Sequence, residues 1–309
     1  MRVVVTGGAG FIGANLCRAL LASGVDEVVA FDDLSTGFEA NLTGVDAELV
    51  VGDILDVATI GRVAAGASSI VHLAARPSVP RSITDPIASH AANASGTASV
   101  LEAARAAGVG HVTVASSSSV YGANPALPKH EGLVTAPVSP YAASKLAAES
   151  YALAWQRSFG LPVLAFRFFN VFGPLQAAGH AYAAVVPAFV SAALEGRPLP
   201  IHGDGTQTRD FTYVGTVASV LSDAATRQVA FDGPVNLAFG SRVSLLEVVD
   251  RLEALLGHDL ARDHQPSRAG DVGDSQADDS RLRELFPDLE PVVLDEGLAA
   301  TIDWFRSEA

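Results

Sequence analysis

The sequence predicts an α/β protein with a doubly wound parallel sheet, and two observations carry this prediction. Along the first 170 residues, short apolar runs alternate with longer helix-forming segments. This alternation is typical of βαβ units with right-handed crossovers, which build a parallel sheet. The first apolar run, 3–5, consists of three valines and leads into a glycine-rich turn. A continuous β-branched run of this kind indicates a strand that is buried on both faces.

The glycines after this strand are typical of a phosphate-binding turn. They fit the pattern G-x-G-x-x-G, in which one glycine allows the turn, one lets a pyrophosphate approach the backbone and one lets the helix pack on the strand. The matching residues are Gly8, Gly10 and Gly13. We expect a helix over 14–21, whose N-terminal N–H groups would point at the phosphates.

A second strand, expected over 27–31, ends at two adjacent acidic residues, Asp32 and Asp33. They stand about 20 residues beyond the turn, where a dinucleotide-binding fold places the carboxylate that binds the ribose. Asp32 would accept hydrogen bonds from the ribose hydroxyls and repel a 2′-phosphate. No Arg or Lys stands within 34–38 to bind such a phosphate. The sequence therefore favours NAD over NADP as the cofactor.

Length and composition exclude several classes of function. The 309 residues, 49% of them hydrophobic, can form a large core, and we expect one compact unit with a nucleotide-binding half and a smaller second half. The net charge of −14 argues against a nucleic-acid surface. No apolar run is long enough for a membrane span, and the eight histidines lack a metal-ligand spacing. The single cysteine, Cys17, cannot form an internal disulfide, which fits a reducing cytoplasm.

The third strand, expected over 48–51, is followed by Asp53 and Ile54. The carboxylate of Asp53 stands at the carboxyl end of a strand, where it could meet the adenine. An equally good interpretation makes it the cap of a helix over 57–63.

The fourth and fifth strands, expected over 69–73 and 111–115, enclose one long Ala-rich helix over 83–107. The small residues Ala74 and Ala75 after the fourth strand would let a cofactor lie against the backbone. The fifth strand leads into four serines, 116–119, at the sheet edge where ligands bind in such folds. Serines also occupy ordinary loops.

Tyr141 and Lys145 stand four residues apart at the start of a helix that continues through residue 154. They therefore share a helix face, and an ammonium group beside a phenol lowers the pKa of the phenol. Tyr141 is thus a candidate general base near neutral pH. An exposed surface pair is the alternative, but the chain has only two lysines, Lys129 and Lys145. A lysine retained in so arginine-rich a chain favours the functional interpretation.

These motifs together resemble the extended short-chain dehydrogenases/reductases, and specifically the nucleotide-sugar epimerase/dehydratase family, over essentially the whole chain. The segments that carry the resemblance are 6–13, 52–54, 72–75, 116–122, 141–145, 167–170 and 209–211. The resemblance implies a Rossmann sheet, bound NAD and a catalytic set formed by Ser117, Tyr141 and Lys145.

The resemblance also implies two sets of binding residues. The expected cofactor contacts are Gly7, Gly10, Phe11, Ile12, Gly13, Asp32, Asp33, Asp53, Ile54, Leu73, Ala74, Ala75, Asn93, Tyr141, Lys145 and Phe168. The expected substrate contacts are Ser78, Val79, Ser117, Tyr141, Asn170, Ile201, His202, Arg209, Arg268, Asp271 and Ser275. Arg209 and Arg268 would hold a pyrophosphate, although either could form an ordinary surface ion pair. His202 could equally be an exposed edge residue.

The second half of the chain is less regular. After a sixth strand over 161–168, we expect helices over 181–194, 245–256 and 298–305, an edge segment at 199–205 and a short strand within 235–240. Ala238-Phe239-Gly240 replaces the Gly-Thr-Gly of many relatives. We expect 1–170 to form the NAD-binding Rossmann unit with a returning segment at about 212–240. Residues 171–211 and 241–309 would then form the smaller, interleaved substrate-binding unit.

By the resemblance, the expected activity is 4-epimerisation of a UDP-sugar through transient oxidation at C4. Dehydratases of the family carry Thr-Asp-Glu where this chain has Ser117-Ser118-Ser119, which disfavours dehydration. A decarboxylase, a 2-epimerase and a non-catalytic NAD-binding relative remain alternatives. Segments 77–82, 181–187 and 270–275 are similar to epimerases that prefer N-acetylated UDP-hexosamines. There, Ser275 would leave room for an acetamido group, unless it is merely a loop serine.

The resemblance also extends to assembly. Helices 83–107 and 141–154 match those that pair in family dimers, so we expect a cytoplasmic homodimer that binds neither nucleic acid nor membrane.

Overall fold

The computed structural model describes residues 1–178, 183–266 and 273–308. Seven parallel strands form the central sheet in the order β11-β6-β5-β4-β1-β2-β3. The order reverses between β1 and β4, and ligands of such sheets bind at this switch point, beyond the carboxyl ends of the strands. The predicted fold class is confirmed. The strands are β1 (Arg2–Thr6), β2 (Glu27–Asp32), β3 (Glu48–Val51), β4 (Ser69–His72), β5 (His111–Ser117), β6 (Val163–Phe168) and β11 (Pro234–Leu237).

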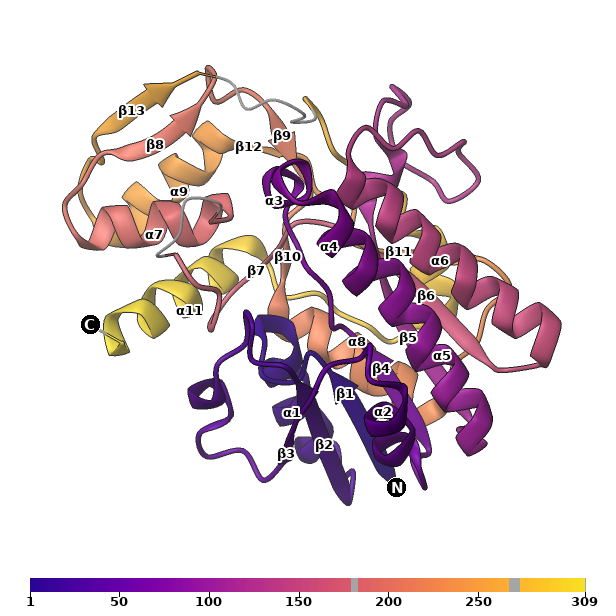
Figure 1. Ribbon diagram of the computed structural model, residues 1–309. Helices are drawn as coiled ribbons and strands as arrows, with labels where there is room; N and C mark the ends of the chain where they lie inside the picture. Colours follow the sequence, from indigo (N-terminus) through magenta and orange to yellow (C-terminus); the bar gives the residue numbers. More distant parts are fainter. Residues whose placement is uncertain (179–182, 267–272, 309) are drawn as a thin grey trace.

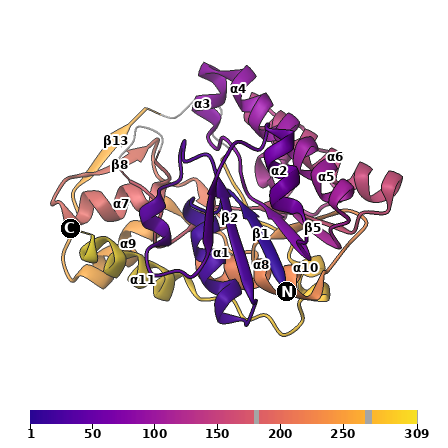
Figure 2. The ribbon, with the colours of Figure 1, turned by 60° about the horizontal axis from the view of Figure 1, so that its bottom comes forward.

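Helices cover both faces of the sheet (Figures 1 and 2). Val3 and Val5 pack into a core with α1 (Phe11–Ala22), α8 (Val214–Arg227) and α10 (Ser280–Leu285). Val4 packs into the opposite core, with α2 (Val57–Ala64), α5 (Gly96–Ala107) and α6 (Pro140–Phe159). Successive strand residues point to opposite faces, so a run of valines supplies both cores at once. α10 joins the first core although the sequence assigns 241–309 to the smaller unit.

A smaller region with its own core lies beside the sheet, at the upper left of Figure 1. Its main elements are α7 (Val185–Leu194), β8 (Leu199–His202), α9 (Leu245–Leu256), β13 (Arg262–Gln265) and α11 (Leu294–Ser307). β13 pairs in parallel with β8. Two short strand pairs connect the region to the sheet, namely β7 (Val171–Phe172) with β10 (Thr212–Tyr213) and β9 (Thr208–Arg209) with β12 (Val243–Ser244).

The long helix expected over 83–107 is wrong only at its start, where the chain breaks at Asp85 after α3 (Val79–Thr84). From Pro86 to Ala107 the helical run is continuous and consists of α4 (Pro86–His90), one π-helical turn (Ala91–Ser95) and α5. Pro86 lacks an N–H and cannot continue a helix from α3, so it opens a new one. Asp85 caps this new helix by accepting the N–H of Ala88 at 3.1 Å.

Two single-turn 3₁₀ helices, Glu39–Leu42 and Ser118–Tyr121, complete the described elements. Within 1–178, 183–266 and 273–308, no helix is long and apolar enough to cross a membrane.

Candidate active site

The glycine turn between β1 and α1 is shaped for a phosphate group. Gly7 has φ +73°, and a Cβ there would lie 2.8 Å from the backbone nitrogen of Ala74. A Cβ on Gly13 would lie 2.0 Å from the carbonyl oxygen of Gly7. The positive φ thus falls one residue before the first glycine of the G-x-G-x-x-G match. No side chain caps the N-terminus of α1 at Gly10, so the first N–H groups of this helix suit a pyrophosphate.

The acidic residues expected near the cofactor lie at the ends of neighbouring strands. Asp32, at the end of β2, is buried and accepts the N–H groups of Ala9 at 3.0 Å and Leu34 at 2.8 Å. Burial raises the pKa of its carboxyl group. Asp53 is exposed and accepts the N–H of Leu55 at 2.8 Å. The cap of α2 is Asp56, so the interpretation of Asp53 as a helix cap is wrong.

Other expected cofactor residues differ in how far they are covered. Leu73, Ala74 and Ala75 lie half-buried beyond the carboxyl end of β4. Ile54 is buried, and its side chain packs on Gly96 of α5. Phe11 and Ile12 are the first two residues of α1. Asp33 is exposed and accepts the N–H of Ser35 at 2.9 Å. Phe168 is the last residue of β6 and is half-buried.

The three expected catalytic residues come together at the carboxyl end of β5. Ser117 is the last residue of this strand, and its hydroxyl accepts the backbone N–H of Ser119 at 3.2 Å and the hydroxyl of Ser119 at 2.9 Å. It lies close enough to the Tyr141 phenol to lower the pKa of that group. Tyr141 and Lys145 occupy the first turns of α6, which Ser139 caps by accepting the N–H of Ala142 at 3.1 Å. The ammonium group of buried Lys145 donates to the carbonyl oxygen of Ala115 at 2.9 Å.

The electrostatics of this group differ from the sequence-based expectation. Burial raises the pKa of Tyr141, and the nearby hydroxyl of Ser117 lowers it by less. Lys145 is not among the groups that lower the pKa of Tyr141, and its ammonium group donates to the backbone of β5. Burial also lowers the pKa of Lys145 to about 8.

A buried polar network connects the glycine turn to α6. His72 lies between the hydroxyls of Thr6, at 2.7 Å, and Thr97, at 3.0 Å. Thr97 in turn donates to the carbonyl oxygen of Asn93 at 2.6 Å. The amide of Asn93 donates to the hydroxyl of Ser144 at 2.9 Å, on the turn of α6 between the two catalytic candidates. Asn93, an expected cofactor contact, is therefore bound within the protein. Burial lowers the pKa of His72 to about 3, so this imidazole is neutral.

A buried ion pair fixes the far side of the same helix turn. Glu149, four residues after Lys145, accepts from the guanidinium of Arg167 at 2.6 and 2.9 Å. The hydroxyl of Ser116 also donates to Glu149, at 2.7 Å. Since Arg167 lies on β6 and Ser116 on β5, the pair anchors α6 to two strands of the sheet.

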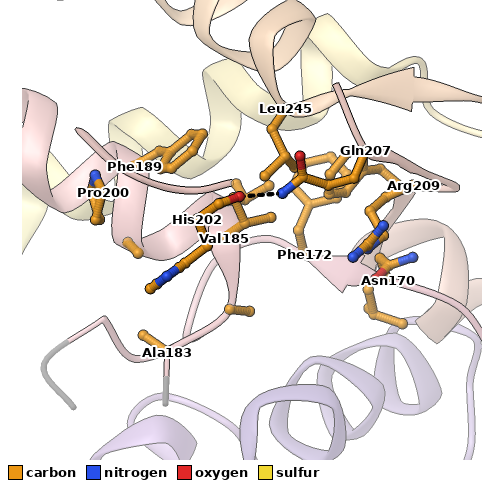
Figure 3. Close-up of a pocket in the computed structure, with 15 residues that line it drawn as sticks. Asn170, Phe172, Ala183, Val185, Phe189, Pro200, His202, Gln207, Arg209 and Leu245 are labelled. Carbon is orange, nitrogen blue, oxygen red and sulfur yellow. Dashed lines mark hydrogen bonds between the residues drawn. The ribbon is translucent and has the colours of Figure 1, made fainter. Parts of the chain in front are cut away.

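The expected substrate residues Asn170, His202 and Arg209 line a cavity of about 250 Å³ in the smaller region. Figure 3 shows Asn170 and Arg209 at one end of the cavity and Pro200 at the other. The guanidinium of Arg209 donates to the carbonyl oxygens of Thr208 at 2.9 Å and Gly273 at 3.1 Å.

The other expected substrate residues that the structure describes do not line this cavity. The side chain of Ile201 is buried in the core of the smaller region, so only its backbone can meet a ligand. Ser78, with φ +106°, caps α3, which begins at Val79. The N–H of half-buried Ser275 donates to the carbonyl oxygen of Thr208 at 3.1 Å. Arg268 and Asp271 lie outside the described residues.

Several residues that hold the site carry only weak sequence signals. Glu149 continues the four-residue spacing of Tyr141 and Lys145 along one helix face. Gln207, which lines the cavity and donates to the carbonyl oxygen of His202 at 2.6 Å, lies two residues before Arg209. Neither spacing by itself separates a positioning role from an ordinary structural one.

Comparisons with known proteins agree with this geometry. Residues 3–238 match the NAD dependent epimerase/dehydratase family. The chain is 38% identical over 321 residues to the UDP-glucose 4-epimerase of Mycolicibacterium smegmatis, with 100% of both chains covered.

Two solved structures are similar over nearly their whole length. The UDP-N-acetylglucosamine 4-epimerase from Methanobrevibacter ruminantium M1, in complex with UDP-N-acetylmuramic acid, matches with a TM-score of 0.94 at 34% identity, covering 100% of this chain and 99% of that one. The dTDP-glucose 4,6-dehydratase from Streptomyces venezuelae, solved with NAD, matches with a TM-score of 0.91 at 33% identity and covers 99% and 97%.

The glycine turn is shaped for a pyrophosphate, and both the family and its NAD-bound relative give NAD as the cofactor. The chain therefore belongs to the NAD-dependent epimerase/dehydratase family of extended short-chain dehydrogenases/reductases.

Proposed function

We propose that the protein is an NAD-dependent 4-epimerase of UDP-sugars. The observation that carries this proposal is the meeting of Ser117, Tyr141 and Lys145 at the carboxyl end of β5, connected to the glycine turn through His72. The identity to a UDP-glucose 4-epimerase over the whole chain supports it.

Each of the three residues would have one role. Tyr141 would take the proton from the 4-hydroxyl of the sugar as the C4 hydride leaves, and would return it after epimerisation. Ser117, close to the Tyr141 phenol, would orient the 4-hydroxyl. Lys145 would hold the ribose next to the nicotinamide. NAD, when bound, supplies the acceptor for the hydride and a positive ring that favours the phenolate. The 4-keto-sugar would turn over and receive the hydride on its opposite face.

The substrate would be held through its nucleotide in the cavity of the smaller region. Arg209 offers a guanidinium fork for the diphosphate. His202 and Gln207 lie further along the cavity, where the nucleobase would fit. Asn170, at the same end as Arg209, would face the sugar.

Dehydration is the second candidate, because a dTDP-glucose 4,6-dehydratase is among the relatives. Loss of water from the sugar requires an acid and a base in addition to the tyrosine. The residues after Ser117 are Ser118 and Ser119, whose hydroxyls titrate far above neutral pH. We therefore favour epimerisation.

The tyrosine provides the direct test. Tyr141→Phe should lower kcat by about 10²- to 10⁴-fold, while NAD still binds because the ring and its packing remain. The matched control is Tyr151→Phe, since Tyr151 lies on the same helix and is 41% exposed. Activity is measured with a panel of UDP- and dTDP-sugars. Retention of more than about half the activity by Tyr141→Phe would remove this residue from the mechanism, and a 4-keto-6-deoxy product would indicate a dehydratase.

We further propose that N-acetylated UDP-hexosamines are accepted, because by the resemblance a serine at 275 would leave space that a tyrosine would fill. Ser275→Tyr should then suppress conversion of UDP-N-acetylglucosamine much more than conversion of UDP-glucose. Ser280→Tyr, at an exposed serine of the same segment, is the control. An unchanged ratio of kcat/KM for the two sugars in Ser275→Tyr would disprove the gate and leave the epimerase assignment intact.

We also propose a homodimer formed by the helices around α6. Ile87 on α4 is 77% exposed, and Ile83 on α3 and Tyr151 on α6 are also exposed. α3 and α4 both pack against α6, so these apolar side chains belong to neighbouring elements. Ile87→Glu should shift the molecular mass measured by light scattering from dimer to monomer. A wild-type protein that is monomeric at micromolar concentration would refute the proposal.

A further inference from the structure

Asp210 is a completely buried carboxylate directly after Arg209, with 0% of its surface exposed. One carboxylate oxygen accepts the backbone N–H groups of Gly240 at 3.0 Å and Ala277 at 2.9 Å. The other oxygen accepts the hydroxyl of Ser241 at 2.9 Å. Three donors offset part of the cost of burying this charge, since hydrogen bonds to a charged acceptor are stronger than those to a neutral one. Burial still raises the pKa of the Asp210 carboxyl to about 6.

These donors belong to separate parts of the chain. Gly240 and Ser241 follow β11, the edge strand of the sheet. Ala277 lies in the C-terminal part of the chain, between β13 and α10. Asp210 thus joins the sheet, the C-terminal segment and the end of β9 at one point. Its own carbonyl oxygen accepts the side-chain N–H of Asn170 at 3.2 Å.

The same point lies beside the contacts between β9, which carries Arg209, and segment 273–277, which carries Ser275. Arg209 binds the carbonyl oxygen of Gly273, and the N–H of Ser275 donates to Thr208. Segment 273–277 is therefore held at one end by Arg209 and at the other by Asp210. Loss of the Asp210 carboxylate would loosen segment 273–277. The carbonyl oxygen of Gly273, which accepts from the Arg209 guanidinium, lies in this segment and would be less firmly held.

The arrangement also gives a physical account of the unusual Ala238-Phe239-Gly240. Gly240 has φ +74° and offers its N–H to Asp210. Ala238 is fully buried, and the side chain of Phe239 packs on the first core. The contact with Asp210 at Gly240 is made by the backbone, so the side chains at 238 and 239 can change without removing it.

We propose that Asp210 is a positioning residue that sets Arg209 and segment 273–277 for the diphosphate of the substrate. The inference rests on the proposed function, because it takes the cavity as the nucleotide site. Asp210 does not contact the ligand in this arrangement. Its carboxylate oxygens accept hydrogen bonds from Gly240, Ser241 and Ala277. The guanidinium that would meet the phosphates belongs to the preceding residue, Arg209.

Asp210→Asn is the test, measured on the NAD-loaded protein with UDP and UDP-glucose. Asparagine has the same shape but no charge, and its NH₂ group would face either the two backbone N–H donors or the hydroxyl of Ser241, which would have to turn and accept. We expect KM for UDP-glucose and Kd for UDP to rise at least about tenfold, with kcat within about threefold of wild type and NAD retained. Asp204→Asn is the matched control, because Asp204 is exposed on the turn before β9 and its carboxylate accepts the backbone N–H and the hydroxyl of Thr206. It should leave both constants unchanged.

A second variant keeps the proposal open to refutation if Asp210→Asn does not fold. Ser241→Ala removes one of the three donors and should raise the same two constants by about two- to fivefold. Equal UDP affinity in a folded Asp210→Asn, or in Ser241→Ala when Asp210→Asn fails to fold, would overturn the inference. So would a fall in kcat at constant KM. If the wild type binds UDP but converts no UDP-sugar, the proposed function fails, whereas the ratio of UDP affinities still decides the role of Asp210.

Discussion

Replacing Glu149 with glutamine should lower the free energy of unfolding by about 3–5 kcal/mol, the range for breaking a buried ion pair. The side chains of Glu149 and Arg167 are both 4% exposed. Three charge-assisted bonds meet at this carboxylate, at 2.6, 2.7 and 2.9 Å. Glutamine would keep the shape, but it would point an NH₂ group at a donor and leave the guanidinium buried without a counter-charge.

The assay is equilibrium unfolding in urea, with an exposed pair of the same residue types as control. Glu102 and Arg105 on α5 are both 43% exposed and lie 2.5 Å apart. Glu102→Gln should therefore cost only about 0–1 kcal/mol. The double variant Glu149→Met/Arg167→Met should be more stable than Glu149→Gln, because it leaves no buried charge. A loss in Glu149→Gln no larger than that in Glu102→Gln would refute this reasoning.

Three further predictions follow from the cofactor site and the buried imidazoles. Gly13→Ala should abolish NAD binding in a titration, because its Cβ would lie 2.0 Å from a carbonyl oxygen of the turn, whereas Gly61→Ala, with nothing within 4 Å, should leave binding unchanged. Buried Asp32 should make NAD bind at least about tenfold more tightly than NADP, and equal affinities would contradict this. His72 and His111 have pKa values of about 3 and about 4 in the folded protein, because burial disfavours their charged forms. Their stabilising contribution is complete above pH 6.5 and is lost as pH falls from there towards 4, by about 1.4 kcal/mol per pH unit for each histidine. His111→Gln should reduce the slope of unfolding free energy against pH by that amount.

The parts of the fold that depend on local pattern were predictable. Parallel strands are covered on both faces, so their consecutive residues are apolar, as in runs such as 3–5 and 27–31. Such strands can therefore be recognised from a short stretch of sequence. The glycine turn could be recognised because each glycine answers a local steric demand, although Gly7 rather than Gly8 takes the positive φ.

The break at Asp85 and the π turn within the helix expected over 83–107 illustrate what local pattern leaves out. Pro86 indicates that a new helix begins there, but the alanine-rich composition of 83–107 favours one continuous helix. The π turn at Ala91–Ser95 gives no such signal. Asn93 within it binds Arg76 and Ser144, and Thr97 just beyond it binds His72. Such a turn is selected by tertiary partners, and these are known only once the fold is known.

The same limit applies to the residues that hold the candidate site. Glu149 and Asp210 look like ordinary charged residues in a sequence where acidic residues are common. Their roles come from Arg167 on a neighbouring strand and from Gly240 and Ala277 far along the chain. A charge that is buried by long-range contacts cannot be told from an exposed one by its neighbours in sequence.

The late return of the chain to its first sheet has a consequence for biosynthesis. β11 covers the edge of β6, while Val217 of α8 and Leu282 and Phe286 around α10 belong to the core on the face of the sheet that carries Val3 and Val5. A nascent chain that has emerged only as far as residue 170 exposes this apolar face and a bare strand edge, which are a template for aggregation. The apolar face of the segment that is synthesised first therefore stays exposed until nearly the whole chain has been made. We expect holdase chaperones to bind this segment during that time.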